Sequence, residues 1–151
     1  MRRSVRASVY VILLIVTTCQ GCTRSIDRDL VSAAYVGDAN QIKILIQKGA
    51  NTEALAMDGW NALSTASQAG HLEAVKVLLD LGANIDAPEG GGNTALFWAA
   101  FDDRREIIKL LISKGADINK KAKGGETPLH VALRLNHLEA AELLRQSGAR
   151  E

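Results

Sequence analysis

The sequence of 151 residues lacks the features of several common protein classes. Its only cysteines are Cys19 and Cys22, so it is not a small domain held together by several disulfides. A bond between these two would close too short a loop to stabilise much, and no histidine pair lies near them to complete a metal site. The longest apolar stretch, from Ala7 to Cys19 with its threonines, is shorter than the run of about 20 apolar residues that a membrane-spanning helix needs.

An excess of charge of one sign is also missing. The chain has 18 Lys and Arg against 17 Asp and Glu, which gives a formal net charge of +1, and both signs are mixed along it. No basic stripe is therefore present that could hold nucleic acid. The lysine-rich stretch from Lys120 to Lys123 is interpreted as a solvated turn, with a lipid headgroup site as the alternative.

A set of catalytic residues is absent as well. Ser, Asp and Glu are scattered without a shared spacing, and the sequence offers no nucleophile and base pair in a recognisable pattern. The run from Gly90 to Gly92 precedes a predicted helix near Thr94, but it has no lysine that could hold a phosphate. The sequence therefore predicts no enzyme, no cofactor and no metal site.

The sequence does contain an internal repeat. Several positions recur at a fixed interval of 33 residues, without insertion or deletion. A period of about 20 to 50 residues indicates stacked supersecondary units, none of which can bury its apolar face alone. Three of the recurring sets are Gly49, Gly82, Gly115 and Gly148; Leu30, Leu63, Leu96 and Leu129; and Ala33, Ala66, Ala99 and Ala132.

Each repeat predicts a pair of helices. In the last one, Thr127 is suited to cap a helix and Pro128 to occupy its first position. That helix is expected to run to about Leu135 and to end at Asn136. The equivalent positions in the other repeats hold Gly37, Gly70 and Asp103, and all of these residue types accept the left-handed backbone that ends a helix. A second helix follows with apolar residues at helical spacing and ends at the Gly-Ala pair.

Two segments carry a resemblance to a known family. Residues 125–132 read Gly-Glu-Thr-Pro-Leu-His-Val-Ala, and residues 70–79 read Gly-His-Leu-Glu-Ala-Val-Lys-Val-Leu-Leu. Together they resemble the two halves of the ankyrin repeat pattern. The resemblance covers residues 25–151 and implies an all-α solenoid of four helix-turn-helix units, about 27–54, 55–87, 88–120 and 121–151, joined by short hairpin-like turns.

The ends of this array are expected to differ from its middle. Ile26 stands where later units have Gly59, Gly92 and Gly125, so the first unit should lack its leading turn. In the last unit Arg145 replaces an apolar residue and Ala141 replaces a larger one, which predicts a terminal unit with a polar outer face and a complete array. The resemblance also gives the histidines structural roles: His71 and His137 in hydrogen bonds, and His130 between neighbouring turns.

The segment before the repeats resembles a bacterial lipoprotein signal. Arg2, Arg3 and Arg6 precede an apolar run and then small and polar residues up to Gly21 and Cys22. We expect residues 1–21 to be the signal, Cys22 to be lipidated, and residues 22–26 to be a short tether. Cys19 stands where the lipoprotein pattern usually has leucine, so simple cleavage and an uncleaved anchor are the alternatives. Thr23 after the cysteine implies the outer membrane in a Gram-negative host.

Ankyrin proteins resemble one another in holding partner proteins on their turn tips and on the inner side of their first helices. The resemblance therefore implies a monomeric, periplasm-facing adaptor or scaffold that holds a partner protein on a concave face. The alternative is an inhibitor or immunity-type protein that blocks a toxin or hydrolase. The expected partner-binding residues are Tyr35, Met57, Asp58, Trp60, Gln68, Asn93, Phe101, Asp102, Lys123, Glu126 and Arg134. Trp98 and Phe97 are expected to pack in the core instead.

Overall fold

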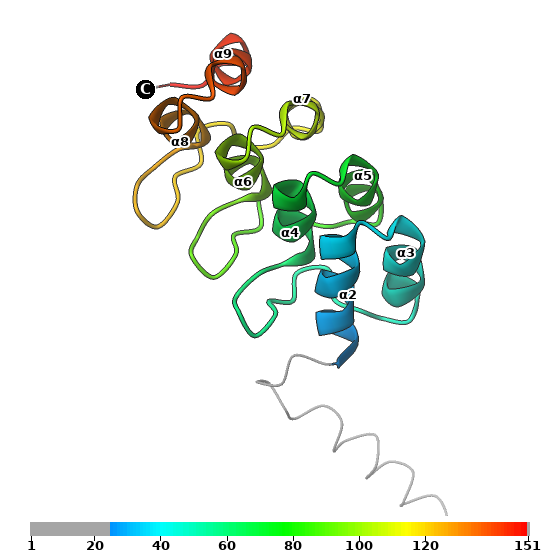
Figure 1. Ribbon diagram of the computed structural model, residues 1–151. Helices are drawn as coiled ribbons and strands as arrows, with labels where there is room; N and C mark the ends of the chain where they lie inside the picture. Colours follow the sequence, from blue (N-terminus) through cyan, green and yellow to red (C-terminus); the bar gives the residue numbers. More distant parts are fainter. Residues whose placement is uncertain (1–24, 151) are drawn as a thin grey trace, which may run out of the picture.

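The computed structural model describes residues 25–150, which form eight helices in four pairs (Figure 1). The expected signal, Cys22 and the start of the tether lie outside the described residues. The first helices of the pairs are α2 (Ser25–Val36), α4 (Ala62–Ala69), α6 (Ala95–Phe101) and α8 (Pro128–Arg134). The second helices are α3 (Ala39–Gln47), α5 (Leu72–Asp80), α7 (Arg105–Ser113) and α9 (Leu138–Gln146). The predicted all-α repeat solenoid is confirmed.

Side-chain caps start the first helix of units two to four. A side-chain oxygen of the residue before each helix accepts a hydrogen bond from a backbone N–H in the first turn. The pairs are Ser64 N to Asn61 Oδ1 (2.8 Å), Phe97 N to Thr94 Oγ1 (3.4 Å) and His130 N to Thr127 Oγ1 (3.3 Å). Asparagine in unit two therefore caps its helix as threonine does in units three and four.

The predicted helix stops are confirmed in all four units. The backbone is left-handed at Gly37 (φ +81°), Gly70 (φ +89°), Asp103 (φ +51°) and Asn136 (φ +62°). The residue after each stop donates its N–H to the carbonyl of the repeated alanine, as from His71 to Ala66 (3.0 Å). Each turn thus satisfies a carbonyl that the helix end would leave unpaired.

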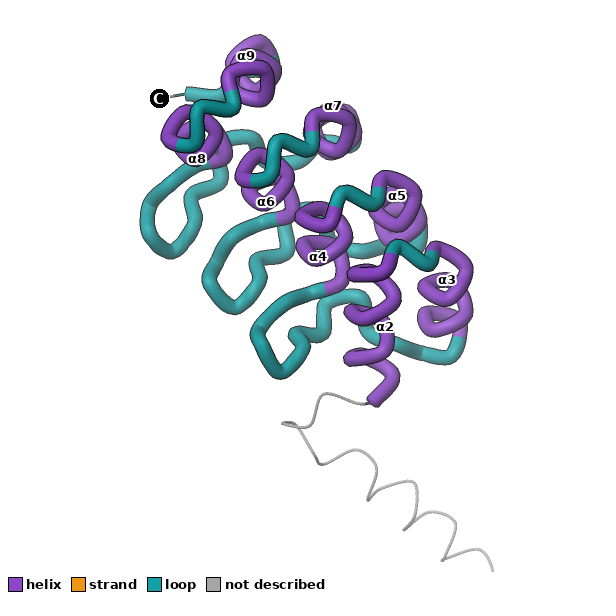
Figure 2. The backbone as a smooth tube through the Cα atoms, viewed as in Figure 1, coloured by secondary structure: helices purple, strands orange, loops and turns teal. Residues whose placement is uncertain are grey.

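The four pairs stack so that each covers the apolar side of the next. Figure 2 shows the first helices in one row and the second helices in a parallel row to the right of it. The position held by Ile42, Val75, Ile108 and Ala141 is no more than 1% exposed in any unit. The core is therefore continuous along the stack, as expected for a repeat protein.

Hydrogen bonds also join neighbouring units at the position after the stop in units two to four. Nε2 of His71 donates to the carbonyl of Tyr35 (2.9 Å), and Nδ1 of His137 donates to the carbonyl of Ala100 (3.2 Å). Their predicted structural role is confirmed. In unit three Arg104 takes this position and donates through Nε to the carbonyl of Gln68 (3.0 Å).

The prediction for His130 needs correction. Its Nδ1 is hydrogen bonded to Oγ1 of Thr127 in its own unit, at 2.7 Å. The side chain is exposed, so it braces one turn and does not join two.

The first unit lacks the leading turn, as expected, and α2 is extended in its place. This helix begins at Ser25, two residues before the expected start of the domain. The buried carboxylate of Asp27 accepts a hydrogen bond from the backbone N–H of Asn51 (2.7 Å), and Ile26 packs against the core. These contacts tie the start of α2 to the fold. Among residues 25–150, no helix has both the length and the apolar character to cross a bilayer.

Candidate functional site

Three hairpin turns project beside the row of first helices, as the loops in Figure 2 show. We call them finger 1 (residues 56–60), finger 2 (residues 89–93) and finger 3 (residues 122–126). In finger 1, the N–H of Ala56 donates to the carbonyl of Trp60 (2.7 Å), and the N–H of Gly59 donates to the carbonyl of Ala56 (2.8 Å). Gly59 has φ +86°, and Gly92 and Gly125 repeat this geometry. A tight turn followed by a left-handed glycine closes a short hairpin, which confirms the predicted turns.

The fingers and the first helices together form one surface, which we call the inner face. Between α2 and finger 1 this face is hollowed by a groove of about 690 Å³, the inner groove. Five of the expected partner-binding residues line it, namely Tyr35, Met57, Asp58, Trp60 and Gln68. The other lining residues are Arg28, Val31, Ser32, Val36, Ala56 and Thr65.

Large apolar side chains stand exposed around the inner groove. Tyr35 is 70% exposed, Val36 is 71% exposed and Met57 is 85% exposed. Single exposed apolar residues are common on protein surfaces, but several gathered at one hollow mark a site of interaction. Residues of this kind bury further apolar area only when a partner covers them.

An aromatic row continues from the inner groove toward unit three. The ring of Trp60 lies 4.5 Å from that of Trp98, and the ring of Trp98 lies 5.2 Å from that of Phe101, between ring centroids. All three are half-buried, so part of each remains at the surface. Phe97 is buried, as expected, whereas Trp98 packs against the core while touching both neighbours in the row.

The remaining expected residues follow the stack and do not gather in the groove. Glu126 and Arg134 pair with each other (2.9 Å), and the amide of Asn93 donates to the buried carboxylate of Glu89 (2.6 Å). Asp102 is half-buried directly after α6, and Lys123 is exposed on finger 3. The expected residues therefore form a line along the inner face, and the inner groove lies at the end of this line near unit one.

Sequence reasoning missed several residues of the groove wall. Arg28, Val31, Ser32 and Tyr35 all come from α2, at spacings of three and four residues that place them on one side of a helix. That spacing was available in the sequence. The repeat register predicts Tyr35 alone, because Arg28 belongs to a turn of helix that only unit one has.

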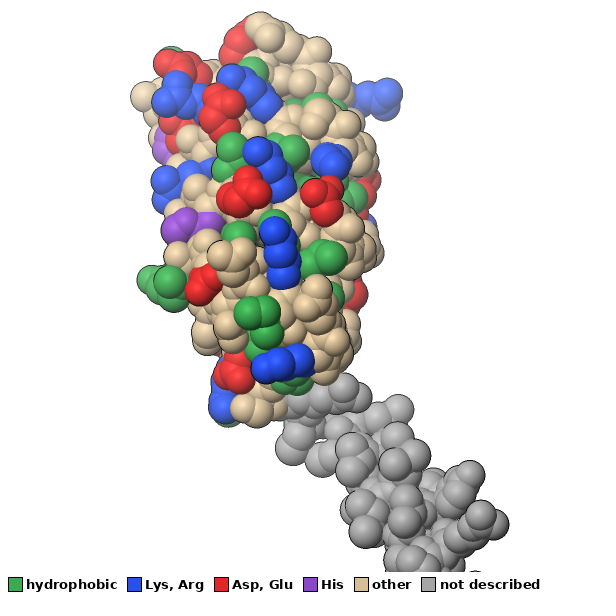
Figure 3. Space-filling model, turned by 90° about the vertical axis from the view of Figure 1, so that its right-hand side faces the viewer, with side chains coloured by type: hydrophobic (Ala, Val, Ile, Leu, Met, Phe, Trp, Pro, Cys, Tyr) green, Lys and Arg blue, Asp and Glu red, His purple; other side chains and the backbone are tan. Residues whose placement is uncertain are grey.

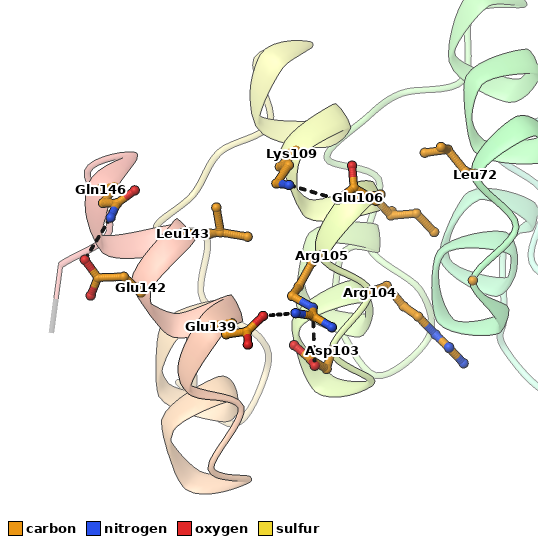
Figure 4. A pocket seen from close by; sticks show the side chains of 12 residues that line it. Leu72, Asp103, Arg104, Arg105, Glu106, Lys109, Glu139, Glu142, Leu143 and Gln146 are labelled. Carbon is orange, nitrogen blue, oxygen red and sulfur yellow. Dashed lines mark hydrogen bonds and ion pairs between the residues drawn. The ribbon is translucent and has the colours of Figure 1, made fainter.

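A second groove lies on the opposite, outer side of the stack. Figure 3 shows this side with Lys, Arg, Asp and Glu interspersed, so no charge of one sign dominates it. The outer groove measures about 680 Å³ and is lined mainly by residues of α7 and α9, as seen close up in Figure 4.

Charged side chains in the outer groove satisfy one another. Arg105 pairs with Glu139 and with Asp103 (3.6 Å), and Lys109 bonds Glu106 (2.8 Å). The hydrogen bond and the charge of Lys109, with the charge of Arg105, hold the pKa of Glu106 below its usual value. The outer groove is thus mainly charged, whereas the inner groove leaves Tyr35, Val36 and Met57 exposed, so the inner groove is the better candidate for a binding site.

Within residues 25–150, no three potential metal-ligating side chains of His, Cys, Asp or Glu come together. Comparison with family models matches residues 30–122 to a model of three ankyrin repeats, and residues 124–150 to a single ankyrin repeat. No curated protein matches the chain significantly.

Proposed function

The chain belongs to the ankyrin repeat family, and from this premise we propose that it is an exported, lipid-anchored adaptor that holds a partner protein on its inner face. Ankyrin repeats form protein–protein interaction modules and are generally binding scaffolds without enzymatic activity. The proposal depends above all on the exposed Tyr35, Val36 and Met57 around the inner groove.

The groove has the properties of a protein-binding hot spot. Such spots are enriched in Trp, Tyr and Arg, and they need a concave site from which a partner can exclude water. The inner groove offers Tyr35 and Arg28 from α2 and Trp60 from finger 1. Only Arg28 and Asp58 are charged among its lining residues, and their charges are opposite, so apolar contact should dominate the binding energy.

The membrane attachment is proposed from the sequence pattern before the repeats. The basic residues, the short apolar run and Gly21-Cys22 support export and lipidation of Cys22. Since α2 begins at Ser25, three residues after Cys22, the fully extended link reaches only about 10 Å. Unit one, whose helix α2 forms one wall of the inner groove, would then lie next to the membrane on its periplasmic side. A partner in the same membrane or close to it fits this placement best.

Cys22→Ala is expected to abolish incorporation of labelled fatty acid and to shift the protein from the membrane fraction toward the soluble fraction. The reason is that Cys22 is the proposed site of acylation, and removal of the acyl chains removes their membrane affinity. Cys19→Ala is the matched control and should keep both the label and the membrane fraction. Equal labelling of the wild type and the Cys22→Ala variant would contradict the anchor.

Capture of a partner tests the adaptor role. The full-length protein is cross-linked in cells and purified from solubilised envelope. We expect a specific partner protein to co-purify with it and to retain its activity in the complex. A captured toxin or hydrolase that loses its activity on binding would instead support the inhibitor alternative. No specific capture at all would contradict both.

A further inference from the structure

The three fingers differ at three equivalent positions. Finger 1 and the two residues before it hold Ala54, Leu55 and Met57. Finger 2 and the two residues before it hold Ala87, Pro88 and Gly90 at the same places. All six are uncharged. Finger 3 and the two residues before it hold Lys120, Lys121 and Lys123 instead, and we call these three side chains the lysines of finger 3. The finger row is therefore apolar at the groove end and cationic at the far end.

No carboxylate neutralises these lysines in the part of the chain that the structure describes. Glu126, the carboxylate on finger 3, is paired with Arg134 instead. Lys121 and Lys123 are exposed, and Lys120 is half-buried. Three like charges held within four residues repel one another, and an acidic partner would relieve that repulsion.

We propose that the partner binds through a segment that runs along the fingers, with an apolar anchor in the inner groove and acidic residues against the lysines of finger 3. This inference rests on the proposed function and adds the chemistry and the direction of the bound segment. Packed helices lie about 8–10 Å apart, so finger 3 lies about 20 Å from finger 1. An extended chain covers that distance with about six residues.

Charge complementarity favours this direction. The groove end carries one charge of each sign, Arg28 and Asp58, whereas the far end carries the uncompensated lysines. An acidic flank placed at finger 3 gains attraction, while the reverse orientation leaves the lysines without counter-charge. Such pairs at the rim of an interface act mainly on association rate and on specificity.

Selection from a random peptide display library on the full-length chain tests the inference. We expect enriched peptides to carry an aromatic or aliphatic anchor and, about six residues away, a cluster of Asp or Glu.

Replacing Lys120, Lys121 and Lys123 by alanine should weaken the binding of a selected synthetic peptide about tenfold at low salt, and should make its affinity less dependent on salt. A matched control replaces three lysines away from the fingers, Lys43, Lys48 and Lys109, and should leave binding unchanged. Lys121→Glu with Lys123→Glu should shift selection toward basic peptides.

The outcomes separate this inference from the proposed function. Enriched peptides that need Tyr35 and Met57 but carry no acidic residues would overturn the inference alone. Peptides that bind equally well without Tyr35 and Met57 would overturn the inner groove as the binding site. The chain could instead bind vesicles that contain phosphatidylglycerol, in a way that depends on the three lysines, while no acidic peptides are enriched. That result would assign finger 3 to a membrane surface and also overturn the inference.

Discussion

Combined Tyr35→Ala and Met57→Ala substitution is expected to weaken binding of the captured partner about 100-fold, which corresponds to about 2.7 kcal/mol. Both side chains line the inner groove, and they are 70% and 85% exposed without a partner. Truncation removes apolar area that the partner would otherwise cover. The change is measured as the dissociation constant of the purified partner from the wild type and from the variant.

Because Tyr35 and Met57 are exposed, the double variant tests binding without disturbing the fold. Exposed side chains contribute little to folding, so the free energy of unfolding should change by less than about 0.5 kcal/mol. Trp60→Ala or Phe101→Ala would be less clear, because these rings pack on Trp98. The matched control is Ile44→Ala with Leu81→Ala, two exposed apolar residues outside the groove. Equal loss in the control and in the test variant would argue against a specific groove.

Ile108→Ala is expected to lower the free energy of unfolding by about 3 kcal/mol. The side chain is fully buried in α7, and its loss leaves a cavity between units that the stacked helices cannot close. Because each unit is stabilised by its neighbours, damage in unit three should propagate along the array. Urea unfolding followed by circular dichroism measures the loss.

Lys109→Ala is the control for that experiment. Lys109 follows Ile108 on the same helix, is exposed, and makes one surface ion pair with Glu106. Surface pairs of this kind contribute little to stability, so Lys109→Ala should leave the free energy of unfolding almost unchanged. A cost below about 1 kcal/mol for Ile108→Ala would mean that α7 is not packed between its neighbours as described.

Most of the fold could be predicted because the repeat specifies it several times. Asp103 and Asn136 were recognised as helix stops only because Gly37 and Gly70 occupy the same register, and the backbone is left-handed at all four. The role of Arg104 could have been found in the same way, from its register with His71 and His137. His130 was misassigned because its partner, Thr127, lies within the same turn.

The site was harder to predict than the fold because it depends on where the repeat is broken. The inner groove lies where α2 extends back to Ser25, through positions that the other units give to a finger, so part of its wall has no counterpart in the other units. Register arguments place Tyr35 and Trp60 on the inner face, but they give neither the hollow between them nor the exposure of Val36. The pairing of Glu126 with Arg134 likewise depends on side-chain geometry.

Site-specific photo-crosslinking in cells tests the central claim most directly. A photoreactive amino acid in place of Met57, on finger 1, should cross-link to the partner, whereas the same group in place of Glu106, in the outer groove, should not. Cross-links from position 106 and none from position 57 would show that the partner binds the outer side, and would contradict the inner face as the binding surface.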